Sequence, residues 1–161
     1  MANFWENDPI VKSSTLSKIG TAVSDNRNIP NLEGTSSATG IYQMTKGTFD
    51  LVKNRYQEFS EVKWEDFKSN PDMQTAMSQK LLDDNAKMLA AKNLPQDDLS
   101  QYTVWFSGGT KLASAPANTP IEQIMTSDQI AANKSIQGKT AGEVRAMLQA
   151  RLNKENGVQS E

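Results

Sequence analysis

The chain has 161 residues, 37% hydrophobic and 22% charged, which is ordinary for a globular domain with a real core. Its formal net charge of -2 provides no basic surface for nucleic acid and no polybasic patch for a membrane. The sequence contains no cysteine and no histidine, which excludes disulfides, thiol nucleophiles, Ser-His-Asp triads and His-ligated zinc. We therefore expect no metal and no cofactor, and any catalysis would use carboxylates, hydroxyls, amides or lysine.

The N-terminal stretch MANFWENDPIVK shows no apolar periodicity and no basic start ahead of an apolar block. We expect no signal peptide and no membrane span anywhere in the chain. Residues 1–12 are interpreted as an arm in which Phe4 and Trp5 dock on a partner chain, because large aromatic side chains are favoured at interfaces. A helical domain is expected over residues 13–155, followed by a flexible tail at 156–161.

Helical periodicity and capping signals follow one another along the chain. The expected helices are a first one from Ser13 or Ser14 to about Ser24, one after Thr45, a short turn with Trp64 and Phe67, one after Asn70-Pro71 to about Lys92, and one from Asp97 to the Gly108-Gly109 stop. Capping boxes at Thr119–Glu122 and Thr140–Glu143 mark two later starts. No convincing alternating strand pattern is present, so the predicted fold class is all-α, or α with a minor hairpin.

The segment from Ser36 to Phe49, SSATGIYQMTKGTF, resembles the Gly-x-x-Gln motif of lytic transglycosylases in the lysozyme-like superfamily, especially phage-encoded forms. Four later segments also resemble that group: NPDMQ at Asn70–Gln74, YTVWFSGG at Tyr102–Gly109, IAAN at Ile130–Asn133 and KTAGEV at Lys139–Val144. The resemblance therefore covers most of the chain, from about Ser13 to Leu148.

This resemblance implies a lysozyme-like helical domain that binds peptidoglycan glycan strands. Members of the family use one glutamate as acid and then base, while the sugar's own 6-hydroxyl attacks and gives a 1,6-anhydro product. Such chemistry needs neither histidine nor cysteine. The resemblance also implies substrate-binding roles for Gly40, Tyr42, Gln43, Tyr102, Trp105 and Gly108. Each has a structural alternative, since glutamine amides staple loops, aromatic rings fill cores and glycines end helices.

The family's catalytic glutamate closes the first helix and is followed by serine. If Ser24 is that serine, Val23 occupies the position of the acid. An ungapped alignment places Asp25 there instead, and Glu33 lies inside the following loop. The candidate acids are thus Asp25 and Glu33, each with the alternative of an ordinary loop carboxylate. The family's Tyr-Asn motif is also altered, because Trp105 and Phe106 stand in its place.

Two interpretations of function follow from these residues. The first is a phage virion-associated, lytic transglycosylase-like protein that binds glycan strands, cleaves them weakly during genome entry and is delivered to the host periplasm. The second is a structural virion protein that retains the fold, has lost the chemistry and contacts other virion proteins. The altered acid position predicts feeble or absent turnover in either case.

Overall fold

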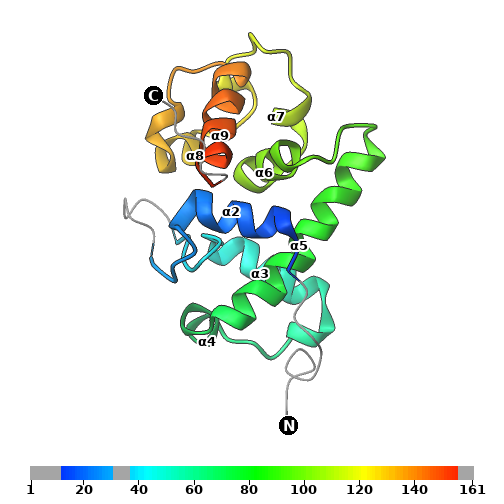
Figure 1. Cartoon of the computed structure of the whole chain (residues 1–161), viewed down its shortest axis with the longest axis vertical. Helices are drawn as coiled ribbons and strands as arrows, with labels where there is room; N and C mark the ends of the chain where they lie inside the picture. Colours follow the sequence, from blue (N-terminus) through cyan, green and yellow to red (C-terminus); the bar gives the residue numbers. More distant parts are fainter. Residues whose placement is uncertain (1–11, 31–36, 156–161) are drawn as a thin grey trace. The chain divides into compact units, whose positions relative to one another are not determined.

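The computed structural model describes residues 12–30 and 37–155, and these are predominantly helical (Figure 1). The chain divides into two compact units, Met1–Asp83 and Asp84–Glu161, with the boundary inside helix α5. This confirms the prediction of a helical protein. Within the described residues, the expected minor hairpin is present only as isolated β-bridges, Pro30 with Thr39 and Thr39 with Met44. The arm and the tail fall in undescribed segments apart from Lys12, and the single domain over 13–155 stays a prediction.

The described residues of the first unit form α2 (Ser14–Ser24), α3 (Lys46–Arg55), η1 (Gln57–Phe59) and α4 (Trp64–Ser69), and they begin α5 (Pro71–Ala91), which continues into the second unit. Their starts agree with the capping signals in the sequence. The Ser13 side chain accepts a hydrogen bond from the Leu16 N–H at 3.2 Å, and Thr45 accepts one from Thr48 at 3.2 Å. Each bond satisfies a backbone donor that the first helical turn leaves without a partner.

The core of the first unit is built from apolar faces that the helical spacing predicts. Leu16 and Ile19 of α2 are fully buried, and Phe49 of α3 is 1% exposed. The Phe49 ring contacts Phe67 of α4 with centroids 5.0 Å apart, and Trp64 stacks on Phe67 at 5.4 Å. These contacts hold α3 and α4 together.

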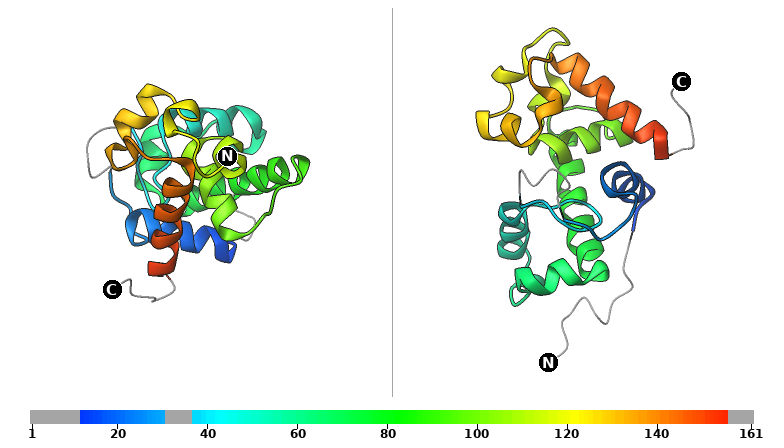
Figure 2. Two further views of the ribbon diagram at one scale, coloured as in Figure 1. Left: turned by 90° about the horizontal axis from the view of Figure 1, so that it is seen from above. Right: turned by 90° about the vertical axis from the view of Figure 1, so that its left-hand side faces the viewer.

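The second unit contains α6 (Asp98–Ser107), α7 (Lys111–Ser114), η2 (Ile121–Gln123), α8 (Ser127–Ala132), η3 (Lys134–Ile136) and α9 (Ala141–Glu155). Helix α9 packs against α6 and α7 (Figure 2). Val144 and Leu148 of α9 are fully buried, as the sequence pattern predicts. Among the described residues, none of the helices combines the length and apolarity that a membrane crossing requires.

One of the two predicted capping boxes is confirmed. The Glu143 carboxylate accepts a hydrogen bond from the Thr140 N–H at 3.0 Å, and the Thr140 hydroxyl accepts one from the Glu143 N–H at 3.3 Å. This reciprocal pair begins α9.

The predicted box at Thr119–Glu122 is wrong. Helix η2 starts after Pro120 without a side-chain cap. The reason is long-range backbone pairing: the Ile121 N–H donates to the Lys139 carbonyl at 2.9 Å, and the Ala141 N–H donates to the Thr119 carbonyl at 2.8 Å. The extended conformation required by this pairing replaces the helical turn that the local signal predicts.

Candidate functional site

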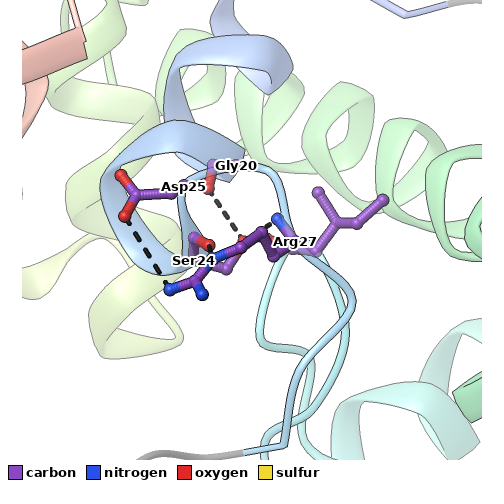
Figure 3. Close-up of polar contacts among 5 residues, drawn as sticks. Gly20, Ser24, Asp25 and Arg27 are labelled. Carbon is purple, nitrogen blue, oxygen red and sulfur yellow. Dashed lines mark hydrogen bonds and ion pairs between the residues drawn. The ribbon is translucent and has the colours of Figure 1, made fainter.

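Ser24 joins the C-terminal end of α2 to the turn Gly40–Gln43. Its side chain is 5% exposed, and its hydroxyl lies 2.6 Å from the Ile41 carbonyl oxygen and 3.1 Å from that of Gly20. The Ser24 hydroxyl oxygen also accepts a hydrogen bond from the Arg27 N–H at 3.2 Å. Figure 3 shows Ser24 held between Gly20 and Arg27 while Asp25 projects away from it. The serine that the resemblance places beside the catalytic acid is therefore a direct link between the helix end and the Gly-x-x-Gln segment.

Gly20 allows α2 to lie close to this turn. A Cβ atom at Gly20 would lie 3.1 Å from Cε1 of Tyr42 and 3.2 Å from Cγ2 of Ile41, and it would also collide with the Asn26 side chain. Contacts this short are rare for a real Cβ, so a larger residue would displace the turn.

The turn itself is closed by a backbone pair and carries two left-handed residues. Thr39 and Met44 exchange N–H to carbonyl hydrogen bonds of 3.1 Å. Gly40 has φ 86 and Gln43 has φ 52, a conformation that glycine adopts readily and other residues adopt at a cost. The glycine of the motif is thus explained by backbone geometry.

Gln43 folds back on the loop. Its Nε2 donates to the Ile29 carbonyl at 2.9 Å and to the Gly40 carbonyl at 3.0 Å. The Gly40 N–H donates to the same Ile29 oxygen at 2.8 Å. The amide therefore staples the turn to the strand-like segment before it, which is the structural alternative for this residue. Its predicted contact with substrate stays a prediction.

The candidate acids lie in different surroundings. Val23 is half-buried in the last turn of α2, and its side chain cannot transfer a proton. Asp25 caps α2 in a left-handed conformation with φ 57. Its side chain is 65% exposed and pairs with Arg27 at 3.9 Å (Figure 3). Glu33 lies in a segment that the structure does not describe.

A one-acid mechanism near neutral pH needs a carboxyl whose pKa is raised by burial, and which reaches the glycosidic oxygen. The exposed Asp25 has no such burial. Asp25 is also a left-handed cap residue two positions after Val23, so its side chain leaves the backbone at a different place. The candidate acid that the structure describes therefore lacks the burial of a proton-transfer site.

The two tyrosines predicted to contact sugar lie in the core. Tyr42 is 1% exposed and its hydroxyl bonds that of Thr75 at 2.9 Å. Tyr102, in the second unit, is fully buried, and burial raises its pKa against the opposing effect of the nearby Arg151 guanidinium. Burial likewise raises the pKa of Tyr42. Both rings take the structural alternative of filling the core.

The remaining candidates, Trp105 and Gly108, also belong to the second unit. Trp105 is half-buried on α6. Gly108 ends α6 with φ 84, and its N–H donates to the Val104 carbonyl at 2.8 Å. This is the left-handed helix stop that the Gly108-Gly109 pair predicts.

Two residues central to this arrangement were missed by the sequence analysis. Gln74 of α5 is 1% exposed and accepts a hydrogen bond from the Ile41 N–H at 2.9 Å, while Asn28 accepts one from Gln74 Nε2 at 2.9 Å. Gln74 belongs to the quoted NPDMQ segment, yet its partner lies 33 residues away in the sequence. No local pattern identifies a hydrogen bond over that separation.

No group of three or more acidic, His or Cys side chains in residues 12–30 and 37–155 could hold a metal ion. No protein-family model matches the chain, and no match was found among curated proteins.

Proposed function

We propose that this chain is a phage virion-associated, lytic transglycosylase-like protein that binds peptidoglycan glycan strands and cleaves them feebly or not at all. The observation that carries the proposal is the 2.6 Å contact from the Ser24 hydroxyl to the Ile41 carbonyl. It brings the end of α2 and the Gly40–Gln43 turn together, which is the relation between helix end and motif that the resemblance implies. Binding is favoured over cutting because valine precedes Ser24 and Asp25 is exposed.

A ligand titration followed by NMR tests the proposal. Full-length protein is titrated with chitotetraose, an N-acetylglucosamine oligomer, and with cellotetraose, which lacks the N-acetyl groups, as the matched control. We expect chitotetraose to shift the amide signals of Asp25–Ile29 and Gly40–Met44, because these backbone segments surround Ser24. Equal shifts with both sugars would contradict recognition of peptidoglycan glycan. Absence of any shift in these segments would contradict the site.

The second candidate is a structural virion protein that retains the fold without glycan binding. It is favoured by the burial of Tyr42 and Tyr102, because two of the three aromatic rings expected to stack on sugar are in the core. The same titration separates the candidates. A structural protein gives no sugar-dependent shift and co-sediments with other virion proteins instead.

A further inference from the structure

Gln74 lies in the first turns of α5, and its amide joins three separate segments of the first unit. Oε1 accepts a hydrogen bond from the Ile41 N–H at 2.9 Å. Nε2 donates to Asn28 Oδ1 and to the Phe67 carbonyl, each at 2.9 Å, and lies 3.3 Å from the Lys68 carbonyl. The Gln74 side chain is 1% exposed, and its bond to the Phe67 carbonyl is fully buried. One amide thus links the motif turn, the loop after α2 and the end of α4.

The backbone of the Gly40–Gln43 turn also lies directly against the Gln74 amide. A Cβ atom at Gly40 would lie 2.5 Å from Gln74 Oε1 and 2.7 Å from its Cδ. Such distances are too short for any side chain, so only glycine lets the turn backbone reach Gln74. The requirement at Gly40 therefore has two causes, its positive φ and its contact with the glutamine.

The hydrogen-bond pattern admits only a carboxamide at this position. The Ile41 N–H needs an acceptor, whereas Asn28 Oδ1 and the Phe67 carbonyl, which also accepts from the Asn70 N–H at 3.2 Å, both face the donor side of the amide. An ionised carboxylate accepts but cannot donate, and an apolar side chain does neither. A buried backbone group that loses its partner keeps the full cost of desolvation.

We propose that Gln74 is the positioning residue of the Gly40–Gln43 turn, which it holds at the end of α2 in the orientation that contacts glycan. The proposal that Gln74 fixes the position of the turn does not depend on what the turn binds. Only its consequence for glycan affinity rests on the proposed function. Gln74 acts through Ile41 and Gly40 and is not a catalytic residue.

The first test compares Gln74→Glu with the matched variant Gln79→Glu. Gln79 is also buried on α5, at 7% exposure, and its amide bridges the Ser13 N–H and Asp83 at 2.9 Å each, away from the turn. Hydrogen exchange of the Ile41 amide is measured by NMR in both. Gln74→Glu leaves an acceptor for the Ile41 N–H, but it turns a carboxylate oxygen that cannot donate toward Asn28 Oδ1 and the Phe67 carbonyl. Repulsion between these oxygens should displace the side chain and speed Ile41 exchange by about tenfold or more, the order of magnitude of one buried hydrogen bond, while Gln79→Glu should leave it near the wild-type rate.

Unchanged Ile41 exchange in a folded Gln74→Glu protein would overturn the proposal. An equal increase in both variants would do the same, because it would indicate general destabilisation. If Gln74→Glu does not fold, Asn28→Ala takes its place. Asn28 is exposed, and Asn28→Ala removes one acceptor of the Gln74 amide together with the donation of Asn28 Nδ2 to the Lys68 carbonyl at 2.9 Å. Asn28→Ala should still speed Ile41 exchange by several-fold, and no change there would overturn the proposal.

The second readout is chitotetraose affinity. We expect Gln74→Glu to weaken binding about tenfold, equivalent to about 1.4 kcal/mol, with Gln79→Glu close to wild type. Faster Ile41 exchange with unchanged affinity would overturn the link between the turn and glycan. A wild-type protein that does not bind would contradict the proposed function, and the exchange result would still decide whether Gln74 positions the turn.

Discussion

Substitution of Gly20 tests how closely α2 and the turn are packed. Gly20→Ala adds one methyl group at contacts of 3.1–3.2 Å to Tyr42 and Ile41. Overpacking of this kind typically costs about 1–3 kcal/mol, which exceeds the gain of about 1 kcal/mol from replacing a helical glycine. We expect a lower free energy of unfolding, measured by urea denaturation.

The matched control for this variant is Gly47→Ala. Gly47 lies in α3, and a Cβ there meets nothing within 4 Å. Its replacement should raise the free energy of unfolding by up to about 1 kcal/mol. A higher free energy of unfolding for Gly20→Ala would contradict the close packing of α2 against the turn, because it would show that the turn moves at little cost to accept the methyl group.

The helices differ in how well the local sequence predicts where they begin. Helix starts at Ser13, Thr45 and Asn70 could be predicted because each cap bonds a backbone N–H only three residues away. The absence of a capped helix start at Thr119 could not be predicted. The backbone there pairs with residues 139–141, and no feature of the local sequence indicates this pairing.

The candidate site shows the same division. The loop-stapling alternative for Gln43 followed from residue type, and it agrees with the observed hydrogen bonds. The role of Gln74 could not be predicted, since its amide reaches segments separated from it in the sequence by up to 46 residues. Burial of Tyr42 likewise depends on the packing of Gly20 against the turn, which composition and periodicity do not specify.

The capping box of α9 predicts a specific pH dependence. Hydrogen bonds from the Thr140 backbone and side chain lower the pKa of Glu143 below its ordinary value of 4.5. A lowered pKa in the folded state adds stability above the unfolded pKa, and this stability is lost as pH falls through the lower folded pKa. Glu143→Gln keeps an acceptor but removes the charge. The melting temperature of wild type should therefore exceed that of Glu143→Gln above pH 4.5, with the difference closing at lower pH.

Glu122→Gln is the control for this measurement, because Glu122 is exposed and lies in η2, which has no side-chain cap. Its melting curve should follow wild type across the same pH range. A wild-type advantage over Glu143→Gln that persists unchanged into acid would show that the charge of Glu143 is not what stabilises the start of α9.

For the molecule as a whole, the net charge of -2 and a pI of about 5.3 predict no net electrostatic attraction to an anionic cell wall. Binding to purified sacculi should therefore depend on short-range contacts. We expect the sedimented fraction to change less than about twofold between about 0.1 M and about 1 M salt, although the Debye length falls from about 10 Å to about 3 Å. A steep loss of binding over this range would instead indicate recognition through charged groups.

The central proposal is that this protein binds glycan and that its described residues place no acid at the end of α2. Digestion of purified peptidoglycan with mass analysis of the soluble products tests it directly. The account predicts no more than traces of anhydro-muropeptides from wild type, because Val23 precedes Ser24. Val23→Glu should raise their yield at least tenfold, since a placed general acid typically contributes about 100-fold or more. Strong wild-type cleavage that survives both Asp25→Asn and Glu33→Gln would contradict the account and place the active site elsewhere.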